Sequence, residues 1–322
     1  MEETRACLLS YAFDGEGGGR LLDLATIADD DQRFIWIHLN GRHADAKRFI
    51  KDQLKLDPLL QKALLAEEMR PRLEERGANA LLLLRGINFH PGPTPEDLVS
   101  IRLWINGNRI ISVSRRKSRA VSDMDDRVKQ GIGPKRVGEF IAMLCSSLND
   151  GIEPAILDLD ETVDRLEEIS LESPDTNLRN DIAAIRKQAT LFKRHMSPQR
   201  DVYSRLYISQ LNCLTPADKW LMQDNNDRMT RFLEDLDVLR ERSQILQDEL
   251  TSALSSKLNK NLYILSIITA LFMPLSFFSG LLGMNLSGIP GASHPMSFGI
   301  ACGIAVMIAL CEVLIFKKLK WF

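Results

Sequence analysis

Residues 262–283 read LYILSIITALFMPLSFFSGLLG, an apolar run without any Asp, Glu, Lys or Arg. Because an α-helix rises about 1.5 Å per residue, this run can cross a hydrocarbon core of roughly 30 Å. Residues 296–316, MSFGIACGIAVMIALCEVLIF, form a second run of similar length. The sequence between the two runs contains Gly and Pro, which break a helix. We therefore expect an integral membrane protein with two C-terminal transmembrane helices.

Basic residues flank both runs on one side only. Lys257 and Lys260 precede the first run, Lys317, Lys318 and Lys320 follow the second, and the connecting loop has no Lys or Arg. The positive-inside rule then predicts that both termini are cytoplasmic. The N-terminus has no basic segment followed by an apolar one, so we expect no cleaved signal peptide.

Two residues depart from a plain membrane-anchor pattern. Pro274 lies inside the first run, where it removes a backbone donor and is expected to bend the helix. Glu312 lies near the cytoplasmic end of the second run. An acid within a membrane segment is a functional candidate. Glu312 is therefore either a structural acid paired with the nearby lysines or a proton-coupling group.

The first part of the chain has an α/β pattern. Asn106-Gly107 predicts a hairpin turn between the last two strands, and Asp57-Pro58 predicts a helix start. Helical spacing of apolar residues covers 43–55 and 58–75. The strand-like runs are residues 6–13, 34–39, 80–89, 98–105 and 109–114.

Long helices follow from about residue 136. We expect one helix to residue 172, a second over 176–195 with Ser197-Pro198 as a kink or a new start, and an antiparallel arrangement of the two. The first carries acidic residues that form either a solvated face or a metal-sensing surface: Asp158, Asp160, Glu161, Asp164, Glu167 and Glu168.

A third helix is expected to begin at Thr215-Pro216 and to continue unbroken into the first membrane run. Its apolar residues recur with alternating spacings of three and four, as in a coiled coil. One helix cannot bury such a seam alone, so the seam predicts oligomeric packing around an axis. The seam consists of Met229, Phe232, Leu236, Leu239, Ser243, Leu246 and Leu250.

Composition excludes several classes of protein. A net charge of −2 argues against nucleic-acid binding. The sequence contains no Walker loop, nucleophile elbow, dinucleotide fingerprint or zincin motif, so we do not expect an enzyme. The five cysteines show no metal-ligand or disulfide-framework spacing, and His38, His43, His90 and His195 form no metal-binding pattern.

Gly283-Met284-Asn285 ends the first membrane run and resembles the signature of the CorA family of divalent-cation transporters. Pro274, Ser276 and Gly280 precede it as in the family's P-x-[TS]-x(3)-G-x(2)-GMN pattern. The basic ending KKLKW at 317–321 and the segment RPRLEE at 70–75 also resemble family sequences. The resemblance covers nearly the whole chain.

Several details resemble the zinc-transporting ZntB branch of that superfamily. The loop NLSGIPG at 285–291 lacks the Met-Pro-Glu-Leu common in the magnesium branch, although Ser287 stands where glycine is more usual. Further similarities are SIRLW at 100–104, RRK at 115–117 and GIGP at 131–134.

The resemblance implies a homopentameric funnel in the bacterial inner membrane, with a central pore lined by one first-span helix per subunit. Gly283, Met284 and Asn285 would form the selectivity filter, in which Asn285 hydrogen-bonds a hydrated ion. His294 is a weaker candidate that could gather zinc. Counting inward from Asn285 at helical intervals gives the expected pore-lining residues Gly280, Ser276, Met273, Thr269, Leu265 (or Ser266), Leu262 and Asn259. For the apolar ones, helix packing remains an alternative.

The expected fold class is α+β. The cytoplasmic part is expected to consist of an α/β domain (1–135), a helical hairpin region (136–214) and a stalk helix (215–261). The membrane part is expected to consist of two transmembrane helices (262–285 and 296–316) joined by an outer loop (286–295) and followed by a basic tail (317–322). The expected function is uptake of Zn²⁺, with possible proton coupling and no bound cofactor. The alternatives are a Mg²⁺, Co²⁺ or Ni²⁺ channel, zinc efflux, and a membrane-tethered scaffold that transports nothing.

Overall fold

The computed structural model describes residues 6–22, 33–54, 56–67, 70–87, 98–172, 175, 177–284 and 295–318. It divides into an N-terminal unit, Met1–Gln247, and a C-terminal unit, Asp248–Phe322. The division falls within one long helix, α6 (Pro216–Leu282).

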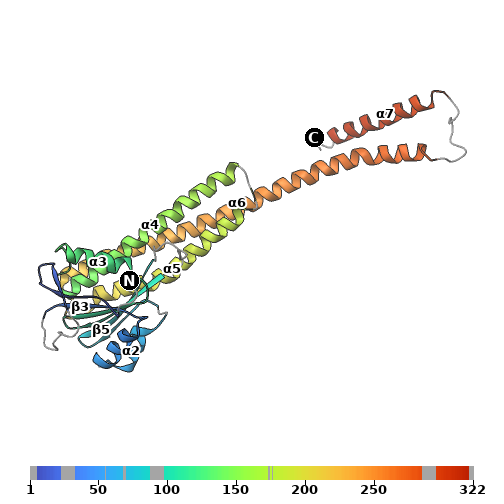
Figure 1. Cartoon of the computed structure of the whole chain (residues 1–322). Helices are drawn as coiled ribbons and strands as arrows, with labels where there is room; N and C mark the ends of the chain where they lie inside the picture. The colour runs from blue at the N-terminus through green and yellow to red at the C-terminus, as the bar shows by residue number, and fades with distance from the viewer. Residues whose placement is uncertain are drawn as a thin grey trace. The chain divides into compact units, whose positions relative to one another are not determined.

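The N-terminal unit contains a mixed sheet of strand order β2-β1-β3-β7-β6-β5-β4 (Figure 1). Only the β3–β7 pair among the described strands is parallel. The predicted hairpin is confirmed, since Asn106 pairs with Arg109 and Gly107 has a φ of 55°, a backbone conformation that favours glycine. The strands are β1 (Cys7–Phe13), β2 (Gly19–Leu21), β3 (Ile35–Asn40), β4 (Arg72–Arg76), β5 (Asn79–Ile87), β6 (Leu98–Asn106) and β7 (Arg109–Ser114).

Both faces of the sheet are covered, so its central strands are apolar on both sides. On one face, Ile35, Ile37 and Leu39 pack in a cluster with residues of α1 (Ala44–Arg48), of the π-helical turn η3 (Phe49–Gln53) and of α2 (Pro58–Leu65). On the other face, Trp36 packs against Phe140, with ring centroids 4.9 Å apart and the rings tilted by 59°. Alternate residues of β3 therefore belong to different cores, as strand geometry requires.

The predicted helix over 58–75 is wrong in its second half. Asp57 caps α2 as expected, accepting a 2.7 Å hydrogen bond from the amide of Leu59, but α2 ends at Leu65. Residues 72–76 form strand β4, which pairs with β5. Pro71 explains the change, because it has no N–H and disfavours helical backbone in the residue before it. The short strand β2 and the helix α3 (Arg119–Lys129) were not predicted either.

Three long helices complete the unit. They are α4 (Val137–Glu172), α5 (Leu178–Ile208) and the first part of α6, and Figure 1 shows them running side by side. Of the two alternatives at Ser197-Pro198, a new helix start does not occur, since α5 continues through Pro198. The predicted start of α6 is confirmed: Asp218 accepts hydrogen bonds from the amide (2.8 Å) and hydroxyl (2.7 Å) of Thr215.

The seam of α6 corrects one inference from the sequence. All seven seam residues are buried within a single chain, from Met229 (0% exposed) to Leu250 (2%). In the N-terminal unit, α4 and α5 contact α6 through polar bonds beside the seam, such as Lys193 Nζ to Asp237 Oδ1 at 2.6 Å. The polar seam residue Ser243 donates to the carbonyl of Leu239 at 2.7 Å. The seam therefore has a partner in its own chain and does not by itself predict an oligomer.

The C-terminal unit contains the end of α6 and the helix α7 (Ser297–Lys318). Within the described residues, three helices are long and apolar enough to cross a membrane, namely α6, α7 and α4. The apolar windows of α6 and α7 are 0% buried, whereas that of α4 is 61% buried. Since α4 packs against α3, α5 and β5 in the N-terminal unit, its apolar residues are already covered by protein.

Candidate functional site

The residues predicted to line an ion pathway lie on one face of α6. Their spacings of three and four residues match the helical repeat. Every one of them is solvent-exposed in the single chain, including Leu265 (59%) and Met273 (66%). The face is formed by Asn259, Leu262, Leu265, Thr269, Met273, Ser276 and Gly280. An apolar face left uncovered over this length requires lipid or another subunit as its partner.

Hydroxyl groups give this apolar region of α6 a polar character. Thr269 Oγ1 donates to the carbonyl oxygen of Leu265 at 2.8 Å, and Ser266 Oγ donates in the same way to Leu262 at 2.8 Å. Because the hydroxyl proton is used within the helix, the lone pairs of each oxygen remain available as acceptors. Such an oxygen can accept a hydrogen bond from the water shell of a cation without carrying a charge.

The end of α6 places two of the three predicted filter residues. The amide of Gly283 donates to the carbonyl of Ser279 at 2.9 Å and closes the last turn, and Met284 follows it with 44% of its surface exposed. Asn285 and His294 lie outside the described residues. The filter and the loop metal ligand therefore stay predictions.

Pro274 and Glu312 occupy the positions expected from the sequence. The helix α6 continues through Pro274, which cannot donate to the carbonyl of Ala270. Glu312 lies in α7, and its Oε2 atom is buried without a hydrogen-bond partner in the part of the chain that the structure describes. The expected pairing with neighbouring lysines is not seen among those residues.

No group of three or more His, Cys, Asp or Glu side chains that could hold a metal ion occurs among the described residues. The acidic face predicted on α4 is instead partly neutralised by arginine. Arg242 of α6 contacts Asp160 at 2.8 Å, Glu167 at 2.7 Å and also Asp164. These contacts raise the pKa of the Arg242 guanidinium, the bonds to Glu167 contributing most.

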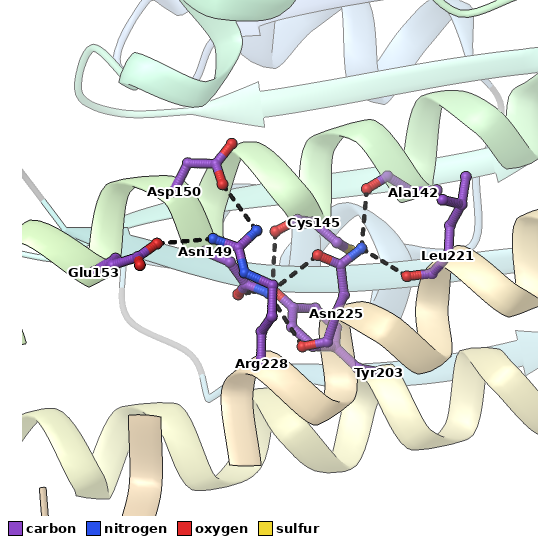
Figure 2. A network of polar contacts seen from close by, with 9 residues as sticks. All are labelled: Ala142, Cys145, Asn149, Asp150, Glu153, Tyr203, Leu221, Asn225 and Arg228. Atoms are coloured by element: carbon purple, nitrogen blue, oxygen red, sulfur yellow. Dashed lines mark hydrogen bonds and ion pairs between the residues drawn. The ribbon is translucent and has the colours of Figure 1, made fainter. Parts of the chain in front are cut away.

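A buried polar network joins α4, α5 and α6 in the N-terminal unit (Figure 2). Asn149 Nδ2 donates to Asn225 Oδ1 at 3.0 Å and to its carbonyl at 3.1 Å. Tyr203 OH donates to Asn149 Oδ1 at 3.3 Å, and Gln199 Nε2 donates to Tyr203 OH at 3.0 Å. Burial raises the pKa of Tyr203 well above its ordinary value. The network therefore links three helices through neutral groups.

Arg228 adds a charged contact at the edge of this network (Figure 2). Its guanidinium donates to Asp150 at 2.8 Å and to Glu153 at 3.1 Å, both on α4, and lies 6.0 Å from the ring centre of Phe232. The roles of Arg228, Arg242 and the Asn149–Asn225 pair were not predicted from the sequence. The available signal was the polar residues that flank the seam of α6, whose partners on α4 are some 75 positions away in sequence.

Comparison with known proteins agrees with this arrangement. Residues 31–318 match the family model described as "CorA-like Mg2+ transporter protein". The chain is 34% identical to the "Divalent cation transporter CmaX" of Pseudomonas aeruginosa, covering 99% of this chain and 98% of the other. It is 32% identical to the "Zinc transport protein ZntB" of Yersinia enterocolitica, with coverages of 97% and 95%. The full-length CmaX structure superposes with a TM-score of 0.86 at 33% identity, covering 98% of each chain.

Proposed function

The chain belongs to the CorA-like Mg²⁺ transporter family, and from that premise we propose that it carries Zn²⁺ across a bacterial inner membrane. The choice of zinc is supported by the similarity to ZntB over 97% of the chain and by the loop at 285–291, which has no acid. Magnesium transport is the second candidate, because the matching family model is described by that ion.

The exposed face of α6 carries this proposal most directly. It is uncharged beyond Lys260, and Thr269 and Ser276 supply hydroxyls between the larger apolar residues Leu265 and Met273. A divalent cation holds its water strongly, so neutral oxygens that contact the water shell attract the ion without trapping it. The apolar positions then form constrictions that close by excluding water.

We propose that several copies of α6 surround the pathway, as a homopentamer with two transmembrane helices per subunit and both termini in the cytoplasm. Exposed apolar residues on α6 and α7 support contacts with lipid and with other subunits. We propose that one Asn285 from each subunit forms a ring that contacts the hydrated ion at the outer end of the pathway. Gly283 and Met284 complete the proposed filter. His294 is proposed to gather zinc in the loop.

Glu312 is the proposed proton-coupling residue. Its carboxylate oxygen is buried without a hydrogen-bond partner among the described residues, and no other charged residue occurs between 261 and 316. An acid within a membrane segment is a candidate for carrying protons across it.

Metal uptake into proteoliposomes tests the proposal. Purified full-length protein is reconstituted, and entry of Zn²⁺ and of Mg²⁺ is followed with and without an inward proton gradient, using empty vesicles as the control. We expect zinc entry above the control and faster entry with the gradient. Zinc entry equal to that of empty vesicles contradicts the proposal. Magnesium entry that exceeds zinc entry and ignores the gradient assigns the chain to channel-type magnesium transport.

A further inference from the structure

The ion pairs between α4 and α6 repeat at equal intervals along both helices. On α6, Arg228 and Arg242 are separated by exactly two heptads, and each contacts a pair of carboxylates on α4 (Figure 2 shows the first pair). The two carboxylate pairs are separated by two heptads as well: Asp150 (2.8 Å) with Glu153 (3.1 Å), and Asp164 with Glu167 (2.7 Å). Because residue numbers rise together on both sides of these contacts, α4 and α6 run in the same direction.

Asp235 lies midway between the two arginines in the sequence of α6. It is on nearly the same side of the helix as both, because two turns take about 7.2 residues. The residues midway between the carboxylate pairs of α4 are Leu157 and Asp160, and Asp160 is bonded to Arg242 at 2.8 Å. Partial burial and then the charge of Asp160 raise the pKa of Asp235, so the two carboxylates are near each other. The observed register therefore sets Asp235 beside one leucine and one acid that already has a cation.

The apolar seam of α6 does not select this register by itself. Its residues recur with spacings of three and four, so moving α6 along its axis by one heptad sets apolar side chains against apolar side chains again. Buried apolar residues of α4 recur with the same spacings: Ile152, Ile156, Leu159, Val163 and Leu166. Two helices with such rows can pack in more than one register unless polar residues distinguish between the registers.

Asn149 and Asn225 distinguish the registers within the seam. They are 0% and 3% exposed, and Asn225 lies one helical turn before Met229, the first seam residue. The two side chains bond to each other at 3.0 Å (Figure 2). A shift of one heptad in one direction would set Asn149 against Phe232, and in the other direction it would set Asn225 against Ile156. Either shift would leave buried amide groups opposite apolar side chains, which is costly.

We propose that Asp235 and the Asn149–Asn225 pair together select the axial register of α6 against α4. A shift of one heptad in either direction would bring Asp235 against a carboxylate pair that an arginine contacts in the observed register. Like charges would then repel, and ion pairs of Arg228 and Arg242 would be lost at the same time. Asp235 thus weakens the observed register slightly and the shifted registers more. This device lies in the N-terminal unit and does not depend on which metal ion the protein transports.

A full-length variant without the selecting residues tests the proposal: Asn149→Leu, Asn225→Leu and Asp235→Asn combined. The register is read by zero-length carbodiimide coupling in detergent followed by mass spectrometry. In wild type, this reagent should join Lys193 of α5 to Asp237 of α6, whose Nζ and Oδ1 atoms are 2.6 Å apart. Moving α6 by one heptad also moves it past α5, so this link reports the shift. The combined variant should lose about half of the link or more, as two registers become similarly populated, and new links from Lys193 to Glu234 or Glu241 should appear.

Stability separates register selection from a merely structural role. Replacing both partners of a buried hydrogen bond by apolar groups can be nearly neutral, so the combined variant should keep a Tm close to that of wild type. The single variant Asp235→Asn should keep the link and raise Tm, because the observed register then loses only a repulsion. The control Asp224→Asn alters an exposed aspartate of α6 outside this row and should change neither the link nor Tm.

Two results would overturn the proposal. A folded combined variant that keeps the wild-type yield of the Lys193–Asp237 link would show that the apolar seam and the remaining contacts fix the register without these residues. If the combined variant does not fold, Asp235→Asn decides. A Tm of Asp235→Asn equal to or below that of wild type would show that Asp235 supports the observed register instead of selecting against shifted ones.

Discussion

The two units of this protein differ in how their apolar side chains are covered. In the N-terminal unit, the six seam residues of α6 from Met229 to Leu246 are buried within the chain, and flanking polar residues have partners on α4 and α5. In the C-terminal unit, the apolar windows of α6 and α7 are 0% buried. A single chain thus completes the core of the first unit, whereas the apolar helices of the second need lipid or another subunit to cover them. We infer that mutations in the first unit act on folding and those in the second act on transport.

Leu236 provides the largest expected difference in stability. It is 0% exposed in the seam, whereas Val238, two positions away on the same helix, is 54% exposed. Leu236→Ala should lower the free energy of unfolding by about 3 kcal/mol, because it leaves a cavity in a packed core. Val238→Ala should change it by less than about 0.5 kcal/mol. Thermal unfolding of both variants in detergent checks this, and equal losses of stability would contradict a seam buried within one chain.

His38 should make the N-terminal unit sensitive to acid. Its Nδ1 and Nε2 atoms lie 2.7 Å and 3.1 Å from the hydroxyls of Ser112 and Ser114, and burial lowers its pKa to about 4. The unfolded chain binds a proton at the ordinary pKa of about 6.5, but the folded chain does not do so until near pH 4. Stability is therefore lost as pH falls through this window, by about 2 kcal/mol between pH 6.5 and pH 5.

The check for His38 is the change of Tm with pH in His38→Asn. This variant should lose most of the decline between pH 6.5 and pH 5, while His43→Asn, which alters a more exposed histidine, should retain it. A decline of the same size in His38→Asn would assign the acid sensitivity to other groups.

Arg242 provides a smaller electrostatic effect. Arg242→Gln leaves Asp160, Asp164 and Glu167 close together without their shared cation, and it should destabilise the protein by about 1 kcal/mol at low salt. The effect should shrink as salt screens the carboxylates. Arg240→Gln is the matched control, since Arg240 forms an ion pair with Asp237 of its own helix. Unfolding in low and high salt measures the difference, and an effect of Arg242→Gln that is unchanged by salt would contradict the electrostatic explanation.

The sequence could predict those parts of the fold that depend on neighbouring residues, but not those that depend on residues distant in the chain. Local signals identified Asp57-Pro58, Asn106-Gly107, Thr215-Pro216 and the two apolar runs, and the structure has a turn or helix at each. The strand β4 was missed because its pattern over 72–76 is polar, and only pairing with β5 makes it a strand. The acidic face of α4 was read without Arg242 because the two helices are distant in sequence.

For the candidate site, the sequence could predict the properties of a single helix but not those that depend on its surroundings. Helical spacing was sufficient to predict one exposed face on α6, because that property belongs to a single helix. The width of the proposed pore and the arrangement of a proposed Asn285 ring would depend on how subunits assemble, which one sequence does not specify.

Zinc uptake by Asn285→Ala tests the central claim most directly. The variant is reconstituted beside wild type and beside Asn261→Ala, which removes a similar amide from an exposed position of α6 outside the predicted ion-facing set. If an Asn285 ring contacts the hydrated ion, Asn285→Ala should lose at least about tenfold of the initial rate of zinc entry, equivalent to about 1.4 kcal/mol. Asn261→Ala should transport as wild type does, and Tm should be unchanged in both. Wild-type zinc entry in folded Asn285→Ala would contradict the account.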